Sequence, residues 1–431
     1  MHKSILRIAV PAILSNIVVP LLGLIDLSIA GHIGNASVIG AVSVGATMFS
    51  LTYWNFGFLR MGTSGMTAQA LGAGNGKAQS VMLFRAVALA LALGAAIVAI
   101  SVPLRELLLA AISPTVEVKA LASRYFSIVI WGAPAMLATM GITGWFIGMQ
   151  NSTYPLVVSL IVNIVNIAAS LLLVFAAGMG FEGIPTGTLI AQWTGVLASA
   201  AFAMGMMRKH GLHAPERISD AFKGLRKFFR VNADIFIRSL CMMAVMLFFT
   251  SAGARSGDLT LAVNAMFMQM YLFYSNFMDG FAYAGEALVG KFAGASDGVS
   301  LKRCVAKLFM WGWAMALIFA FAYGLFNEPA MRLFSDDANV VAFAADYKIW
   351  VALAPVAGMA AFVWDGVFVG LTATRAMLAS LATATAVFFS TYLLAPTADA
   401  NSRLWLAYLL FLAVRGIVLW VWFKKSLRLG V

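Results

Sequence analysis

Asp26 is a lone carboxylate in the middle of the first apolar segment of the sequence, Ile8 to Ala30. The segment is long enough to cross a lipid bilayer. An ionisable side chain at that depth costs roughly 2.5 kcal/mol or more, so it usually faces a protein cavity where it binds a proton, an ion or a charged ligand. The sequence therefore predicts a functional carboxylate at Asp26.

Polar side chains in two later apolar segments could join Asp26 in one site. Asn163, Asn166 and Ser170 are spaced by three and four residues, which places them on one face of a helix. Thr188 lies near the start of the next apolar segment. These four side chains would either line a proton or cation site with Asp26 or form hydrogen bonds between helices, and their spacing fits both interpretations.

A second group of acids lies in the C-terminal half of the sequence. Asp279, Tyr283 and Glu286 stand at i, i+4 and i+7 on one helical face, and Asp365 lies in a later apolar segment. Carboxylates at these positions could bind a cationic substrate. The simpler interpretation is that they pair with Arg60, Arg238 or Lys291, because a buried charge needs compensation.

The composition indicates a polytopic membrane protein. Hydrophobic residues make up 62% and charged residues 11% of the 431 residues, whereas soluble domains have about 45–50% and about 25%. Long apolar segments without strand-like alternation predict an all-α integral membrane fold and exclude a barrel. We expect twelve transmembrane helices, at 6–30, 37–58, 81–104, 122–148, 155–177, 186–207, 229–252, 261–288, 304–326, 347–370, 376–395 and 403–423.

The distribution of positive charge predicts the orientation in the membrane. With the N-terminus inside, the inner loops and tails hold about 19 of the Lys and Arg residues and the outer loops about 7. We therefore expect cytoplasmic N- and C-termini in a bacterial cytoplasmic (inner) membrane. The same bias explains the net charge of +12, so no nucleic-acid partner is expected.

The two halves of the sequence resemble each other at an offset of about 223 residues. Gly57 and Phe58 fall on Gly280 and Phe281. Each half would hold six helices, so the two lobes would keep the same orientation, as in transporters with a parallel pseudo-two-fold repeat. We predict an N-lobe at 1–207, a cytoplasmic linker at 208–228 and a C-lobe at 229–431. Asp26 falls on Phe249, so the chemistry is predicted to be asymmetric.

Several motifs, in this order, resemble the multidrug and toxic compound extrusion family and its DNA-damage-inducible protein F subfamily. They are Asp26 after Pro11, then Gly148-Met149-Gln150-Asn151, Asn163-Ile164-Val165-Asn166, Gly280-Phe281 with Glu286-Ala287-Leu288-Val289-Gly290, and Asp365-Gly366-Val367-Phe368-Val369-Gly370. The resemblance covers essentially the whole chain. It implies a secondary antiporter that exports amphipathic, often cationic compounds, driven by an inward flow of protons or sodium.

The resemblance also implies roles for individual residues. Asp26 would be the coupling carboxylate, and the first helix would rearrange about Pro11. Relatives with a characterised N-lobe cation site add an Asn and an Asp on helix five and a Thr on helix six, which match Asn166, Ser170 and Thr188. Because Ser170 replaces the acid, we favour proton coupling at a lone desolvated carboxylate. Sodium bound by Asp26, Asn166 and Thr188 stays the second option.

Two other classes of function were weighed against antiport. A flippase for lipid-linked precursors would share the twelve-helix core, but its cavity should be rich in basic residues, and we place only a few, among them Arg60, Arg238 and Arg415, in or beside the middle of the spans. A membrane enzyme or channel is the other class, yet all four histidines map to ends and loops and no nucleotide or metal motif is present. We therefore expect no enzyme activity and no cofactor, and a monomer whose partners are small compounds and membrane lipids.

Overall fold

The structure, a computed structural model, describes residues 1–34, 36–215, 225–395 and 399–428, and these residues form helices joined by short turns, without a strand. The long helices and helical runs are α1 (His2–Ile33), α2 (Ala36–Trp54) with α3 (Phe58–Gly72), α4 (Gly76–Ala99), α6 (Val116–Val129) with α7 (Ala133–Gly148), α8 (Thr153–Leu171), α9 (Gly183–Lys209), α11 (Leu225–Arg255), α12 (Asp258–Gly294), α13 (Gly298–Leu325), α15 (Ala338–Gly370), α16 (Thr374–Leu394) and α17 (Ala400–Arg428).

The described residues thus contain twelve long helices or helical runs, which confirms the predicted fold class. Two of them continue through a short 3-10 turn, at Asn55–Gly57 between α2 and α3 and at Ile130–Gly132 between α6 and α7. Ten of the twelve are long and apolar enough to span a membrane by length and composition alone. One that falls outside this group, α12, carries Asp279 and Glu286.

The predicted third span, 81–104, was wrong at its C-terminal end. Helix α4 ends at Ala99, and a separate helix of 12 residues, α5 (Ser101–Ile112), begins after a break at Ile100. A second short helix, α14 (Asn327–Phe334), follows α13 in the other half. The run from Gly94 to Leu104 is apolar throughout except at Ser101. Hydropathy therefore gives no signal for the change of helix at Ile100.

The chain divides into two compact units, which we call the N-unit (Leu14–Phe228) and the C-unit (Met1–Ile13 with Phe229–Val431). The boundary passes through α1, whose residues 2–13 belong to the C-unit. There a methyl group on Gly280 of α12 would lie 2.8 Å from the carbonyl oxygen of Ala9. His2 accepts a hydrogen bond at Nδ1 from the indole Nε1 of Trp311 in α13, over 3.2 Å. The start of α1 is therefore held by α12 and α13.

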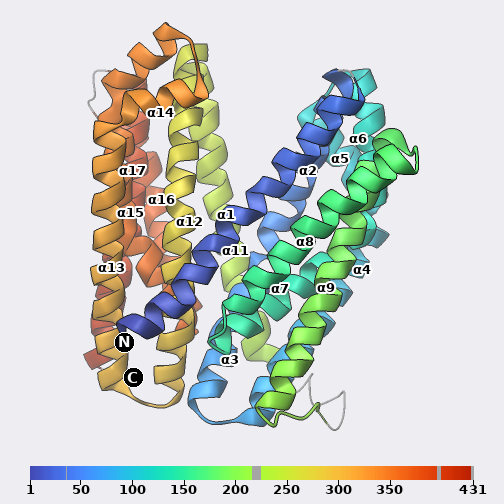
Figure 1. Cartoon of the computed structure of the whole chain (residues 1–431). Coiled ribbons are helices and arrows are strands. Elements are labelled where there is room, and N and C mark those ends of the chain that lie inside the picture. Colours follow the sequence, from blue (N-terminus) through green and yellow to red (C-terminus); the bar gives the residue numbers. More distant parts are fainter. Residues whose placement is uncertain (35, 216–224, 396–398, 429–431) are drawn as a thin grey trace. The chain divides into compact units, whose positions relative to one another are not determined.

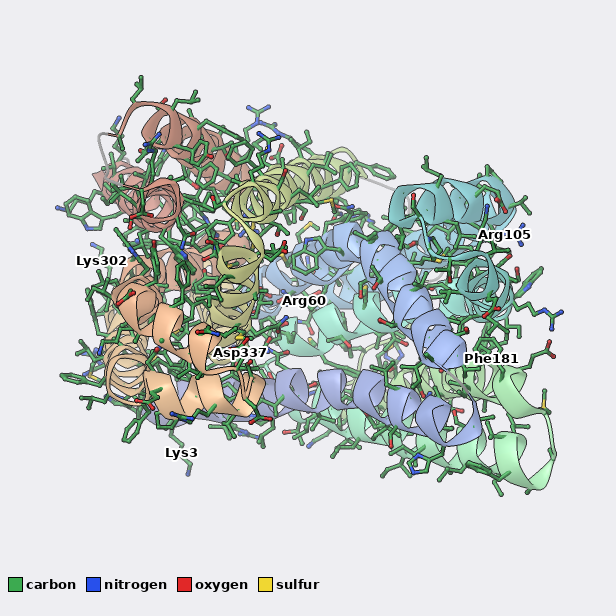
Figure 2. The ribbon with its side chains drawn as sticks, turned by 90° about the horizontal axis from the view of Figure 1, so that it is seen from above. Lys3, Arg60, Arg105, Phe181, Lys302 and Asp337 are labelled. Carbon is green, nitrogen blue, oxygen red and sulfur yellow. The ribbon has the colours of Figure 1, made fainter. Side chains whose placement is uncertain are left out.

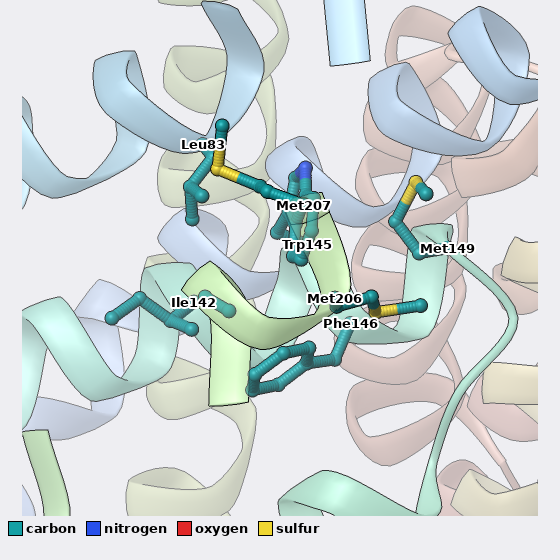
Figure 3. Close-up of a cluster of buried hydrophobic side chains, with 8 residues drawn as sticks. Leu83, Ile142, Trp145, Phe146, Met149, Met206 and Met207 are labelled. Atoms are coloured by element: carbon teal, nitrogen blue, oxygen red, sulfur yellow. The ribbon is translucent and has the colours of Figure 1, made fainter. Parts of the chain in front are cut away.

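In the N-unit, part of the core packs where α4, α7 and α9 meet. Trp145 and Phe146 of α7 lie among Leu83 of α4 and Met206 and Met207 of α9 (Figure 3). The indole of Trp145 donates a hydrogen bond to the backbone carbonyl of Gln79 over 2.9 Å. These contacts hold the N-terminal part of α4 against the C-terminal parts of α7 and α9.

In the C-unit, the N-terminus, the C-terminal part of α17 and the turn between α12 and α13 lie at the same end (Figure 1). Basic side chains gather there. Lys3 and Lys302 are exposed and project from the helices that carry them (Figure 2). Lys424 lies over the ring of Trp420, 3.7 Å from its centroid. This end therefore has the charge expected of a surface that faces anionic headgroups.

The internal repeat is preserved in the turns of the structure. Asn75 caps α4 by accepting a hydrogen bond from the backbone N–H of Ala78, and Asp297, 222 positions later, caps α13 from the N–H of Ser300; both bonds are 2.9 Å long. Gln150 and Thr372 both have positive φ, at 63° and 54°, and stand at the same offset. Matching caps and turns set the same helix starts in both units.

The repeat is also preserved in the closest helix contacts. A methyl group on Gly144 of α7 would collide with the carbonyl oxygen of Arg60 in α3, and one on Gly366 of α15 would collide with that of Ala282 in α12. Both pairs are related by 222 positions. Small residues let the two helix backbones approach closely within the membrane. The same glycine contact therefore fixes α7 against α3 in the N-unit and α15 against α12 in the C-unit.

Candidate functional site

Asp26 lies in the last third of α1 and is buried within the N-unit. Its Oδ2 accepts a hydrogen bond from the hydroxyl of Thr188 in α9, over 3.3 Å. Asn166 in α8 donates from Nδ2 to Oγ1 of Thr188 over 2.9 Å. The structure thus brings together three of the predicted residues, from three helices, in one hydrogen-bonded chain.

The hydroxyl of Thr188 has two acceptors within reach. One is Oδ2 of Asp26, and the other is the backbone carbonyl of Ile184, at 3.2 Å. A hydroxyl has a single hydrogen to donate, and its oxygen already accepts from Asn166. Thr188 therefore donates to one of the two acceptors at a time.

The site also contains two buried oxygen atoms that could accept a hydrogen bond. Oδ1 of Asp26 and Oδ1 of Asn166 have no hydrogen-bond partner among the described residues. The ion pairs of the described part of the chain do not include Asp26. Buried acceptors are normally satisfied. A proton on the carboxyl group or a bound cation would satisfy them.

Ser170 and Asn163 stand farther from this chain of hydrogen bonds. Ser170 is fully buried and donates to the carbonyl of Ile184 over 3.5 Å, so it shares an acceptor with Thr188. Asn163 donates within its own helix, from Nδ2 to the carbonyl of Ser159 over 2.8 Å. Ser170 joins α8 to α9 beneath the site, whereas the bond of Asn163 is local to α8.

Two tyrosines that the sequence analysis missed also belong to this region. Tyr125 of α6 lies near enough to Asp26 to interact with it electrostatically. Its ring packs so closely on α2 that a methyl group on Gly45 would lie 2.9 Å from ring carbons. The hydroxyl of Tyr53 in α2 is buried and has no hydrogen-bond partner among the described residues. A single tyrosine in an apolar helix has no diagnostic spacing, so sequence offered no signal for either residue.

The site provides oxygen atoms of the kind that sodium binds, but few of them. In the described residues, no three His, Cys, Asp or Glu side chains come together as a metal-binding group. The site offers oxygen atoms from Asp26, Asn166 and Thr188, with one negative charge. These are the oxygen types that a hard cation prefers. These three side chains offer fewer oxygen ligands than the number of water molecules that a sodium ion gives up on binding. The geometry therefore suits a proton at least as well.

In the C-unit, Asp365 of α15 forms the centre of a buried ion-pair triad, which we call the arginine triad. Arg238 of α11 and Arg415 of α17 both donate from Nη2 to Oδ2 of Asp365, the latter over 2.7 Å. This confirms that Asp365 pairs with Arg238, and adds Arg415 as a second partner. The triad ties three helices together.

The other predicted acids of the C-lobe lie on α12. Glu286 is buried, and Glu286 and Asp279 both attract the guanidinium group of Arg238. Tyr283 lies between them on the same helix and is partly exposed. The structure therefore places Asp279 and Glu286 in the electrostatic neighbourhood of the arginine triad.

Pro11, the predicted bend, lies within α1 two residues before the boundary of the two units. The helix continues through it to Ile33. Proline has no N–H to bond the carbonyl of Arg7, so one helical hydrogen bond is missing just before the chain enters the N-unit.

Twelve long helices in two repeated units, with a buried carboxylate at the meeting point of three helices, define a membrane transporter of the two-lobe class. The chain belongs to the MatE family, because the model of that family matches residues 11–172 and 235–393. The predicted family is thus confirmed.

Individual relatives agree with this assignment. The chain is 35% identical to DNA damage-inducible protein F of Escherichia coli over 99% of its own length and 93% of that protein. It is 25% identical to a probable multidrug resistance protein NorM of Thermotoga maritima, over 79% of the chain and 74% of the relative. The fold is similar to the bent form of the Vibrio cholerae MATE transporter VcmN, with a TM-score of 0.88, 16% identity and coverage of 99% and 97% of the two chains.

Proposed function

We propose that this protein is a secondary antiporter that exports amphipathic, often cationic compounds in exchange for protons bound at Asp26. The observation that carries the proposal is the buried chain from Asn166 through Thr188 to Asp26, whose carboxylate has no ion-pair partner among the described residues. Membership of a family of extrusion transporters supplies the direction of transport.

Proton binding would rearrange the hydrogen bonds of the site in a defined way. When Asp26 is charged, Thr188 donates to Oδ2; when Asp26 is neutral, Thr188 donates to Ile184 and the acid proton has Oδ1 of Asn166 as an available acceptor. The charged form attracts a cationic compound, and the neutral form does not. Coupling requires that cargo and proton favour different states of the transporter, so this competition supplies the differential affinity.

We also propose proton rather than sodium as the coupling ion. Relatives with a characterised N-lobe cation site have a second carboxylate on helix five. This chain has Ser170 at that position, and its hydroxyl donates to the carbonyl of Ile184. One carboxylate gives a sodium ion little compensating charge. The same carboxylate holds one proton with its charge fully neutralised.

The proposed location is a bacterial cytoplasmic membrane with both termini inside. The end of the C-unit that holds the N-terminus, the end of α17 and the turn from α12 to α13 carries Lys3, Lys302 and Lys424, as the positive-inside rule requires. We propose that the protein works there as a monomer, without a cofactor. Residues 216–224 of the predicted linker, 208–228, lie outside the described residues, and α9 and α11 extend into its two ends.

Efflux from proteoliposomes tests this function. Ethidium release is measured with an imposed pH gradient or an imposed sodium gradient for wild type, Asp26→Asn and the control Asp346→Asn, which alters an exposed aspartate of α15. We expect release driven by the pH gradient in wild type and control, and its loss in Asp26→Asn. Release driven only by a sodium gradient would mean that sodium, rather than the proton, is the coupling ion at this site.

Failure of the folded protein to export several cationic dyes under either gradient would overturn the proposal. The flippase would then be tested with a fluorescent lipid-linked precursor. The structure gives that alternative no particular support, because Arg238 and Arg415, two basic residues of the predicted spans, are paired with Asp365.

A further inference from the structure

Each unit has a short helix directly after a span, and the two helices begin in the same way. Helix α5 follows α4 in the N-unit, and α14 follows α13 in the C-unit. The residues at the two breaks, Ile100 and Phe326, have similar backbone angles, with φ of −97° and −106° and ψ of 14° and 26°. Proline is the third residue of both helices, at positions 103 and 329. A proline ring clashes with the carbonyl four residues earlier, which here belongs to the last residue of the span. The same device therefore ends both spans.

The two short helices also turn corresponding residues toward their units. At the repeat offset of 222, Leu109 of α5 corresponds to Met331 of α14, and both side chains are at most 1% exposed. Glu106 corresponds to Glu328, and both are exposed. Helix α14 lacks the first four residues of α5, about one helical turn, so its faces keep the same directions. The repeat therefore preserves these helices as well as the spans.

Both helices leave an apolar face uncovered. Leu107 follows Pro103 by four residues in α5, and Leu333 follows Pro329 by four residues in α14, so each pair shares a face of its helix. All four side chains are exposed, Leu107 by 68% and Leu333 by 87%. Exposed apolar faces of this kind mark a contact with a membrane or with another protein.

The charged side chains of the two helices form pairs away from the exposed leucines. In α14, Nη2 of Arg332 lies 2.9 Å from Oε1 of Glu328. In α5, Nη2 of Arg105 lies 3.0 Å from Oε1 of Glu106, and its Nη1 donates to the hydroxyl of Ser127 in α6 over 3.0 Å. The glutamate of each helix lies about 100° or more around the helix axis from the exposed leucine. Each helix is therefore amphipathic.

The apolar faces continue the surface by which the spans contact lipid. Helices α4 and α13 are both long and apolar enough to cross a membrane. On α13, Ile318, Phe321 and Leu325 stand at i, i+3 and i+7, and each is more than half exposed. Helix α14 begins two residues after Leu325, and Ile100, between α4 and α5, is also more than half exposed. Because the exposed leucines extend an apolar surface that lies against hydrocarbon, lipid is the occupant that fits them.

Both helices lie at the end of their unit that is remote from the basic side chains or the linker. In the C-unit, α14 lies opposite to the N-terminus and the end of α17 (Figure 1). In the N-unit, a methyl group on Gly76 would lie 3.1 Å from the side chain of Leu212, so α4 starts beside the end of α9. Helix α5 follows the other end of α4. Each short helix thus begins where a span leaves the hydrocarbon layer.

We propose that α5 and α14 bind the lipid surface, lying in the headgroup layer with Leu107 and Leu333 against the acyl chains and their glutamates in water. Amphipathic helices bind this layer by inserting an apolar face about 5–10 Å deep. On the orientation proposed above, it is the layer of the outer leaflet. Each unit has its own helix of this kind, so each unit is anchored at its own depth. The proposal needs only membrane insertion, and it is independent of the coupling ion and the cargo.

Spin labels measure the depth of these side chains directly. The native thiols are removed by Cys241→Ala and Cys304→Ala. Single labels are then placed by Leu107→Cys or Leu333→Cys, and the protein is reconstituted in liposomes of phosphatidylethanolamine and phosphatidylglycerol. Collisions of the label with oxygen, which concentrates in lipid, are compared with collisions with a nickel chelate, which stays in water. We expect the ratio of oxygen to nickel collisions to be several-fold higher at both positions than at control positions on the same helices.

The matched controls are Glu106→Cys and Glu328→Cys, whose labels should collide mainly with the nickel chelate. Labels at 107 and 333 that are as open to nickel as the controls would place the apolar faces in water and overturn the proposal. Labels shielded from both reagents would show that protein covers the faces, whether a second copy of the chain or another part of the same chain, and would overturn it too. A lipid signal at only one of the two positions would refute the shared placement. The measurement needs no transport, so a failure of antiport in the efflux assay leaves its result unchanged.

Discussion

Thr188 links the carboxylate of Asp26 to the backbone of α9 through hydrogen bonds. It accepts from Asn166 and can donate either to Asp26 or to Ile184, at nearly equal distances of 3.3 and 3.2 Å. A hydroxyl with two competing acceptors changes partner at little cost when one acceptor changes its charge. Thr188 is therefore placed to sense proton binding at Asp26 without being titratable itself.

Replacing Thr188 by valine tests this role. Thr188→Val keeps the shape but removes the hydroxyl, and a hydrogen bond to a charged group contributes about 1.5–3 kcal/mol. We expect pH-driven efflux to slow by about tenfold or more, while Thr188→Ser keeps most of the rate because its hydroxyl can make the same bonds. Equal rates for the valine and serine variants, measured in proteoliposomes, would contradict the role.

The arginine triad makes a residue-scale prediction about stability. Replacing Arg238 and Arg415 by methionine leaves Asp365 buried without compensation, and breaking a buried pair in this way costs about 3–5 kcal/mol. Adding Asp365→Leu removes the stranded charge. Thermal unfolding in detergent should therefore show a large loss for the double variant and a recovery of most of it in the triple variant. A triple variant no more stable than the double one would exclude charge compensation as the reason.

At the scale of helices, the sequence predicts long apolar elements well and their ends poorly. Twelve spans and the meeting of Asp26 with Asn166 and Thr188 followed from hydropathy, spacing and family resemblance, and the structure contains both. The break at Ile100 and helix α5 have no hydropathy signal. Tyr125 reaches the site because Gly45 leaves room for its ring, a contact between α2 and α6 that no pattern along the chain encodes.

The paired helix caps Asn75 and Asp297 allow a prediction of pH dependence. The side-chain and backbone hydrogen bonds from Ser300 hold the pKa of Asp297 below its ordinary value of 3.8. A carboxyl with a depressed pKa stabilises the fold above the unfolded-state pKa, and that stability is lost as pH falls through the folded-state pKa. The cap of Asp297 should therefore contribute at neutral pH and vanish in acid, whereas the amide cap of Asn75 should not change.

Thermal unfolding of Asp297→Ala and Asn75→Ala in detergent, at several pH values, measures this difference. Asn75→Ala should lose about 1 kcal/mol, the usual effect of removing a cap, at every pH. Asp297→Ala should be less stable than wild type at neutral pH and should match wild type once the pH has fallen below the depressed pKa of Asp297. An Asp297→Ala deficit that persists unchanged into acid would show that the charge of the cap is irrelevant.

At the scale of the whole molecule, the two units share a framework and differ in their buried charge. Glycine contacts and helix caps repeat at an offset of 222 residues. The N-unit nevertheless has the lone carboxylate of Asp26, whereas Phe249, at the matching place in the C-unit, packs on the ring of Trp405. At the offset of 222, Arg238 of the arginine triad stands ten positions before the counterpart of Asp26, about 15 Å along a helix. The sequence predicted this asymmetry from Asp26 and Phe249, but the two-arginine environment of Asp365 depends on contacts among α11, α15 and α17.

Helix α1 connects the chemistry of the N-unit to the body of the C-unit. Residues 2–13 of α1 belong to the C-unit, where Ala9 and Ile13 lie against Gly280 of α12 and His2 bonds Trp311 of α13, and Asp26 lies beyond the boundary in the same helix. If the two units move during transport, α1 has to absorb part of that movement, and the missing hydrogen bond at Pro11 is the weakest point of its backbone near the boundary.

Replacing Pro11 by alanine should therefore stiffen α1 and slow transport without weakening the fold. Alanine is favoured over proline by up to about 3 kcal/mol within a helix, so the unfolding temperature of Pro11→Ala should stay the same or rise, while efflux in proteoliposomes falls several-fold. Pro355→Ala is the matched control, because it removes a proline inside α15, a helix that stays within the C-unit. If Pro11→Ala exports dye at the wild-type rate, or if Pro355→Ala slows export equally, flexibility at the unit boundary is not what limits the transport cycle.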